Sequence, residues 1–68
     1  MFELYDTVRL KEENTELGIK PSNIGAIVDV LGNGEAYTVE FVDENGDTIE
    51  DALFAEFSED ELELVKPA

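Results

Sequence analysis

The chain has 68 residues with 18 acidic and 4 basic side chains, so its formal net charge is −14 at pH 7, and this length allows one small domain over residues 1–68. The absence of Cys and His excludes disulfides and thiol nucleophiles and removes the commonest general base and transition-metal ligand, so we expect neither a cofactor nor a metal site. No apolar run is long enough to cross a membrane, and residues 1–6 lack the features of a signal peptide, so we expect a cytoplasmic protein.

The first predicted strand covers residues 4–10, where apolar and polar residues alternate. One face of this strand carries Leu4, Asp6, Val8 and Leu10. Residues 11–23 are polar and aperiodic, which predicts a long loop whose acidic residues are solvated. Leu17 and Ile19 are the only large aliphatic residues of that loop, so we expect them to fasten it to the core.

Two further strands are expected in the centre of the chain. Residues 24–31 are nearly all apolar and rich in β-branched side chains, which is typical of a central strand. Gly25 inside this segment predicts a bulge, a strong bend or a close approach of another backbone. A turn at residues 32–34 leads into residues 36–42, which alternate cleanly. One face of that strand carries Tyr37, Val39 and Phe41.

A hairpin and a fourth strand are expected next. Asn45 and Gly46 form the strongest short-range hairpin signal, because both residue types tolerate a positive φ. Residues 48–57 then return as a predicted strand. The residues in phase on its apolar face are Ile49, Leu53, Ala55 and Phe57. Asp51 falls on the same face, and a bulge near Asp51 and Ala52 would resolve that conflict.

A single turn and a short strand complete the predicted fold. Ser58 and Glu61 have the spacing of a capping box, but the segment is too short for a stable helix, so we expect one 3₁₀ turn. Residues 63–66 form a short closing strand that Pro67 ends. This order of elements predicts an all-β fold, a small five-stranded SH3-like barrel with a long first loop and a 3₁₀ turn before the last strand.

Three segments of the chain resemble a family of small uncharacterised bacterial domains of unknown function. They are the Asp-x-Val-x-Leu opening at residues 6–10, the Gly-x-Ile-Val segment at residues 25–28 and the Tyr-x-Val-Glu-Phe-x-Asp segment at residues 37–43. The sequence departs from the family pattern where Ser22 or Asn23 replaces a glycine before Ile24. The resemblance covers nearly the whole chain and implies an SH3-like fold. It implies no chemistry, although such domains often occur beside toxin and immunity proteins.

The composition disfavours several common functions. A chain with so few Lys and Arg residues is poorly suited to phosphate contacts, so we expect no direct nucleic-acid binding. The lack of Trp argues against a polyproline-binding groove. Asp43, Asn45 and Asp47 imitate a calcium loop, but a hairpin turn explains them without a metal. A core this small leaves no room for a substrate pocket, so we expect no enzymatic activity.

The acidic surface is the one feature well outside the norm. Acidic residues are concentrated in residues 43–51 and 56–63, and two interpretations stay open: solubility alone, or complementarity to a basic protein surface. In the second case Phe54 or Phe57 would be the apolar anchor, and Phe54 is the better candidate if Phe57 fills the core. The predicted partner-binding residues are Phe54, Glu56, Glu59, Asp60, Glu61 and Glu63.

These observations favour a non-enzymatic binding module that is a monomer or a weak dimer. The most concrete hypothesis is an immunity- or antitoxin-type inhibitor that covers the basic active-site surface of a toxin. Two alternatives stay open. One is a nucleic-acid mimic that occupies the DNA or RNA site of another protein, and the other is a structural accessory domain of an enzyme complex.

Overall fold

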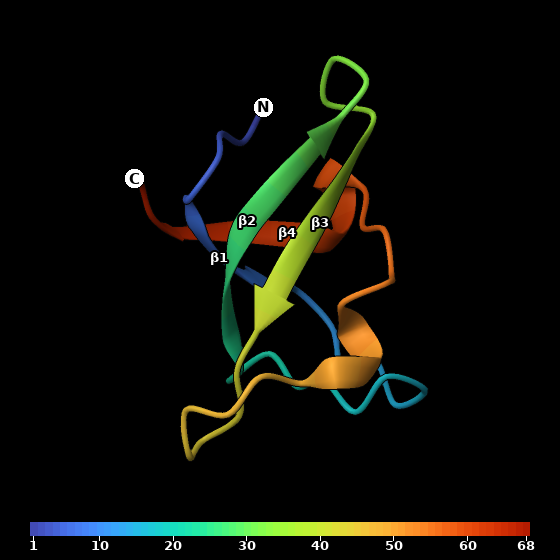
Figure 1. Ribbon diagram of the computed structural model, residues 1–68, viewed down its shortest axis with the longest axis vertical. Helices are drawn as coiled ribbons and strands as arrows, with labels where there is room; N and C mark the ends of the chain where they lie inside the picture. Colours follow the sequence, from blue (N-terminus) through green and yellow to red (C-terminus); the bar gives the residue numbers. More distant parts are fainter.

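Four antiparallel strands form one open sheet in the computed structural model, which describes residues 1–68 (Figure 1). The strands are β1 (Thr7–Leu10), β2 (Ile24–Leu31), β3 (Ala36–Phe41) and β4 (Leu62–Lys66), and they lie in the order β3-β2-β1-β4. Two 3₁₀ turns, η1 (Glu50–Ala52) and η2 (Glu59–Glu61), lie between β3 and β4 in the chain. The predicted all-β class is confirmed.

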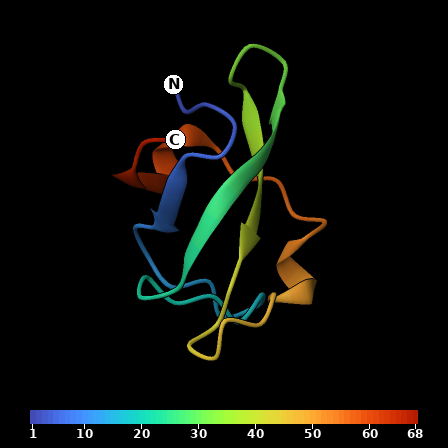
Figure 2. The same ribbon diagram turned by 60° about the vertical axis from the view of Figure 1, so that its left-hand side comes forward.

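β4 lies at a steep angle to the β2–β3 hairpin in Figure 1, whereas β1 runs nearly alongside β2 in Figure 2. Thr7 of β1 pairs with Ala26 on one side and with Lys66 on the other, so β1 joins the hairpin to β4. The pairing register of β1 with β4 shifts between Thr7 and Val8, and a second shift lies in the β2–β3 pairing. Such irregularities raise the local twist, which lets a short sheet curve around a core.

Ten buried apolar residues form a single core under this sheet. They are Val8, Leu10, Ile19, Ile27, Tyr37, Val39, Phe41, Ala52, Phe57 and Leu62. The rings of Phe41 and Phe57 meet edge to face with centroids 5.4 Å apart, an arrangement that aromatic pairs prefer. Ile19 is fully buried and Leu17 packs against the core, so both residues fasten the long loop as predicted.

The predicted strands in the first half of the chain are confirmed with one change of length. β2 covers the predicted residues 24–31. β1 begins at Thr7 rather than at residue 4, because Tyr5 has a φ of 70°, which lies outside the strand region. Gly25 makes the predicted close approach, since a Cβ atom at this position would lie 2.7 Å from the carbonyl oxygen of Glu40.

The turn after β3 is built on the side chain of Asp43. Its carboxylate accepts the N–H of Asn45 at 2.8 Å and the N–H of Asp47 at 3.0 Å. The predicted hairpin turn is therefore confirmed, and Gly46 is its one residue with a positive φ, of 82°. This use of the Asp43 carboxylate supports the hairpin explanation of the calcium-like pattern.

The predicted strand over residues 48–57 is wrong. Only its two ends pair with neighbouring segments, through isolated bridges to Val42 and Tyr37, and η1 lies between them. In a regular strand Asp51 would face the core with the apolar residues. The 3₁₀ turn exposes Asp51 and buries Ala52 instead, so the predicted bulge does not form. This segment is the fourth of the five predicted strands, and its replacement by a 3₁₀ turn leaves a sheet of four strands.

The end of the chain follows the prediction closely. η2 is the expected single 3₁₀ turn, and the Glu61 carboxylate accepts the N–H of Ser58 at 2.9 Å, as the capping-box spacing predicts. β4 begins at Leu62, one residue earlier than expected. No helix of the chain is both long and apolar enough to cross a membrane.

Candidate functional site

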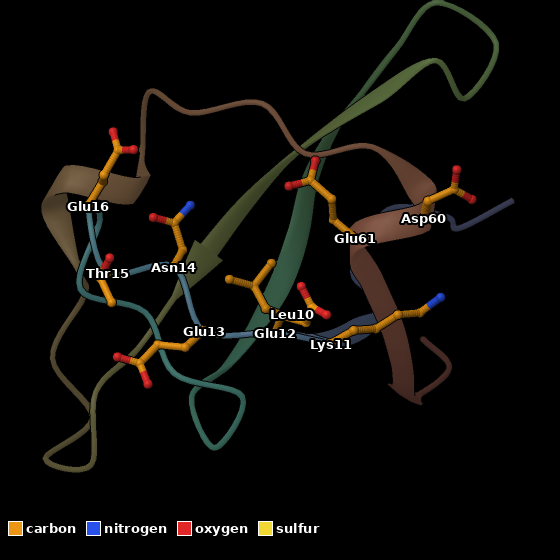
Figure 3. A pocket seen from close by; sticks show the side chains of 9 residues that line it. All are labelled: Leu10, Lys11, Glu12, Glu13, Asn14, Thr15, Glu16, Asp60 and Glu61. Atoms are coloured by element: carbon orange, nitrogen blue, oxygen red, sulfur yellow. The ribbon is translucent and has the colours of Figure 1, made fainter.

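An open groove of about 510 Å³ lies between the start of the long loop and η2 (Figure 3). The lining residues are Leu10, Lys11, Glu12, Glu13, Asn14, Thr15, Glu16, Asp60 and Glu61. The two walls meet where the N–H of Lys11 donates to the carbonyl oxygen of Glu61 at 3.0 Å. The expectation that so small a chain has no room for such a concavity is wrong, because two surface segments rather than the core enclose it. We call these nine residues the acidic groove.

Carboxylates dominate the acidic groove. Five of its nine side chains are Asp or Glu, and Lys11 is the only cation among them. Figure 3 shows the carboxylates of Glu16 and Glu61 on opposite sides of the groove, with Asn14 between them. Like charges that line a concave surface add their fields, so the groove attracts cationic groups from solution.

The loop wall of the groove is a short, well-defined turn. Asn14 and Ile19 exchange backbone hydrogen bonds of 2.8 and 3.0 Å, and the Asn14 side chain accepts the N–H of Leu17 at 3.0 Å. Because Ile19 is fully buried, this turn is anchored to the core. The exposed side chain of Glu16 lies within the turn, so its backbone position is fixed although the side chain is solvated.

The connection between η1 and η2 contains two phenylalanines with opposite environments. Phe57 is 2% exposed and belongs to the core, whereas Phe54 is 93% exposed. The condition under which Phe54 is the better anchor candidate is therefore met. Phe54 follows η1, which lies beside the loop that forms the groove wall in Figures 1 and 2. The backbone that carries Phe54 thus follows an element close to the loop wall of the groove.

Three of the five carboxylates predicted to bind a partner form bonds within the chain. The Glu59 carboxylate lies 3.3 Å from the amino group of Met1 and accepts a hydrogen bond from the Tyr37 hydroxyl at 3.2 Å. The Glu61 carboxylate accepts the Ser58 N–H at the start of η2. Glu63 accepts the Nε–H of Arg9 at 2.6 Å and does not line the acidic groove. Two others, Glu56 and Asp60, are exposed and form no side-chain hydrogen bond or ion pair within the chain. Only Asp60 and Glu61 of the predicted set line the groove.

A family model described as a domain of unknown function (DUF4926) matches residues 4–63. The chain belongs to the DUF4926 family. The match contains β1, β2, β3, both 3₁₀ turns and every residue of the acidic groove, and it confirms the resemblance to a family of unknown function. No curated protein and no solved structure matches the chain.

Two ionisable groups of this DUF4926 domain have shifted pKa values, and neither lines the groove. Hydrogen bonds from the backbone N–H groups of Glu3 and Ala68 lower the pKa of Asp6, and burial opposes them in part. Burial raises the pKa of the Tyr37 hydroxyl, the Phe2 N–H opposes this rise, and Glu59 adds to it. Both groups hold the ends of the chain and so have structural roles.

The carboxylates of the loop wall were missed at the level of the sequence. Glu12, Glu13 and Glu16 were expected to be merely solvated, yet they lie opposite Asp60 and Glu61. Their proximity depends on a contact between segments about fifty residues apart in the chain, the hydrogen bond between Lys11 and Glu61. A local sequence pattern cannot predict a contact between such distant segments. The acidic composition of the loop was therefore the only sign that its carboxylates belong to a binding surface.

Proposed function

We propose that this DUF4926 domain is a non-enzymatic cytoplasmic module that binds a basic protein through the acidic groove. The observation that carries the proposal is the gathering of five carboxylates and one cation around a single concavity. Solubility needs only net charge and no particular arrangement of it. A concave anionic surface, in contrast, speeds the encounter with a cationic partner and fixes how that partner is oriented.

Phe54 supplies the apolar contact that an electrostatic surface lacks. Surface ion pairs contribute little to affinity, typically about 0–1 kcal/mol each, because both charges stay hydrated. Aromatic side chains that enter a pocket of the partner contribute more. The binding surface that we propose therefore combines carboxylates that attract the partner with the exposed Phe54 as its apolar anchor.

The specific form of the proposal is an immunity- or antitoxin-type inhibitor. A toxin that cleaves nucleic acid needs a cationic cleft for the phosphates. A domain of this size with a net charge of −14 fits the charge of such a cleft and would block it without chemistry of its own. The tight turn at Asn14 and Ile19 supports this role, because a preorganised surface loses less conformational entropy on binding.

We place the sheet in the SH3-like class as part of the same proposal. The long loop after β1 and the 3₁₀ turn directly before the last strand support this assignment. So do the isolated bridges of Tyr37 and Val42 to the segment after β3, which lie where a further strand would close the barrel. An experimental structure in which residues 48–57 pair with β3 along their length would support the closed barrel, and one without either bridge would contradict it.

The proposal is tested with two variants of equal net charge. E12Q/E13Q/E16Q removes three groove carboxylates, and D29N/E35Q/E44Q removes three exposed carboxylates elsewhere, so both change the net charge from −14 to −14 + 3 = −11. Each domain is immobilised and exposed at low ionic strength to a lysate of its own host. We expect the wild type and the control variant to capture the same basic protein, which salt releases and which the groove variant retains poorly.

The captured protein then distinguishes the forms of the proposal. Loss of its nuclease or other toxic activity on addition of the domain supports the inhibitor. Competition between DNA and the domain for a protein without such activity would indicate nucleic-acid mimicry instead. Equal retention by the groove and control variants would show that net charge alone acts, and would contradict a groove-specific interface.

A further inference from the structure

The free edge of the sheet lies at β4. In the strand order β3-β2-β1-β4, Tyr37 of β3 and the adjoining Val42 form isolated bridges to the segment after β3, whereas β4 has a neighbour on one side only. An unpaired edge offers a row of N–H and C=O groups to any further strand. The edge at β4 also exposes two aliphatic side chains, since Leu64 is 46% and Val65 is 49% exposed.

The pairing of β4 with β1 shows which backbone groups point outward. Residues of an antiparallel pair alternate between positions that exchange hydrogen bonds and positions that do not. The hydrogen bond from the Lys11 N–H to the Glu61 carbonyl shows that these two residues occupy a hydrogen-bonded position. The alternation then makes Arg9 and Glu63, two residues further along, a hydrogen-bonded position as well. Leu64, which lies opposite Val8 in the other phase, therefore directs its N–H and C=O away from β1.

A two-fold symmetric antiparallel pairing of two sheet edges must centre on one residue, because residues directly opposite each other point to the same face of the sheet. Leu64 meets this condition, since its N–H and C=O both face outward. In that register Leu64 of each copy lies opposite Leu64 of the other, and the two exchange a pair of hydrogen bonds. The two half-exposed leucine side chains then cover each other.

The charges along β4 suit the same register. Lys66 follows the register shift of the β1–β4 pairing and would lie near the start of β4 of the second copy, directly after the three carboxylates of η2. Each copy thus brings its cation to the anionic turn of the other, twice per dimer. The remaining charges of this edge cancel locally, since Arg9 and Glu63 form an ion pair. A parallel pairing would place like charges together.

We propose that β4 pairs antiparallel with β4 of a second copy of this chain, centred on Leu64, and forms a weak dimer with a continuous eight-stranded sheet. The interface shares η2 with the acidic groove but uses none of the loop carboxylates Glu12, Glu13 and Glu16. Because each copy has a net charge of −14, salt weakens their long-range repulsion and should favour the dimer. Salt has the opposite effect on the binding of a basic partner, so the two proposals fail or succeed separately.

Charge swapping at Leu64 tests the dimer by sedimentation equilibrium of the full chain. We expect the wild type to shift towards twice the monomer mass as protein concentration and salt increase. L64K and L64E should each stay monomeric, because like charges would lie directly opposite each other at the two-fold axis. An equimolar mixture of L64K and L64E should restore the dimer mass, a result that misfolding of either variant would not produce.

Two further results control and decide this test. The groove variant E12Q/E13Q/E16Q should dimerise at least as well as the wild type, and circular dichroism should show that L64K and L64E stay folded. A wild type that is monomeric at every concentration and salt would overturn the proposal. Dimerisation that L64K and L64E leave unchanged would place the interface elsewhere and would overturn it equally.

Discussion

The acidic groove and the β4 edge are adjacent in the chain, because η2 supplies one wall of the groove and leads directly into β4. Their charges nevertheless differ. The groove carries five carboxylates and one lysine, whereas the edge carries the Arg9–Glu63 ion pair, Lys66 and two half-exposed aliphatic side chains. This domain therefore does not distribute its charge of −14 evenly. The contrast shows that a strongly acidic chain can gather carboxylates at one concave surface and leave a neighbouring strand with aliphatic side chains exposed.

The largest predicted effect is on the free energy of unfolding, and it distinguishes the buried Phe57 from the exposed Phe54. Phe57→Ala should lower the free energy of unfolding by about 3–5 kcal/mol, because it leaves a cavity beside Phe41. Phe54→Ala, three positions earlier, should change it by less than about 0.5 kcal/mol, since the ring is exposed. Urea unfolding measures both. A comparable loss in the two variants would show that Phe54 packs in the core and is no surface anchor.

A smaller effect is expected at the hydroxyl that joins the start of the chain to η2. Tyr37→Phe removes a group that accepts the Phe2 N–H at 3.0 Å and donates to Glu59 at 3.2 Å. We expect a loss of about 1 kcal/mol in the free energy of unfolding. Glu59→Gln, which keeps a hydrogen-bond acceptor, should lose less. If Glu59→Gln weakens capture of the basic partner without affecting stability, Glu59 belongs to the binding surface instead.

Removing charge from the groove should stabilise the domain. At low salt E12Q/E13Q/E16Q should gain roughly 0.5–1 kcal/mol, because like charges in proximity cost a few tenths of a kcal/mol each. The control D29N/E35Q/E44Q should gain less, since those carboxylates do not line the groove. Thermal melts at low and high salt provide the measurement: the wild-type Tm should rise with salt, and the difference between the variants should vanish.

The smallest effect concerns Asp6, which lies outside both regions and accepts backbone N–H groups near the two ends of the chain. Its folded pKa is lowered by the N–H groups of Glu3 and Ala68, so it contributes stability above its unfolded pKa near 3.8. That contribution should disappear as the pH falls through the lower folded pKa. Asp6→Asn, compared with wild type by urea unfolding from pH 6 downwards, should be less stable near neutrality and should approach wild type in acid. A constant difference would contradict the assignment.

The strands could be predicted where burial alone determines the order of apolar and polar residues. β2 is a continuous apolar run and β3 alternates strictly, and both have the predicted starting residues. η2 was predictable because the contact between Ser58 and Glu61 is local. Residues 48–57 were not, because their apolar positions fit a strand everywhere except at Asp51. The acidic side chain of Asp51 on the apolar face indicated an irregularity at this position. The sequence pattern alone does not show whether that irregularity is a bulge or a 3₁₀ turn.

The acidic groove was predictable only in part. The excess of carboxylates and the exposed Phe54 follow from composition and phase, and the sequence placed Asp60 and Glu61 in a predicted binding set. The loop wall required knowledge that Lys11 pairs with Glu61, a contact set by the register of β1 and β4. The pairing register of two strands that are distant in the chain depends on the whole sheet, so no local motif predicts it.

The groove can be tested directly by titrating the domain with a fluorescently labelled Arg-rich peptide at low salt. We expect the groove variant E12Q/E13Q/E16Q to bind it roughly tenfold more weakly than the wild type, since three surface charge contacts are lost. The control D29N/E35Q/E44Q, at the same net charge, should bind nearly as well as the wild type, and a Glu-rich peptide of equal length should not bind. Equal affinities of the two variants for the Arg-rich peptide would contradict a binding surface at the groove.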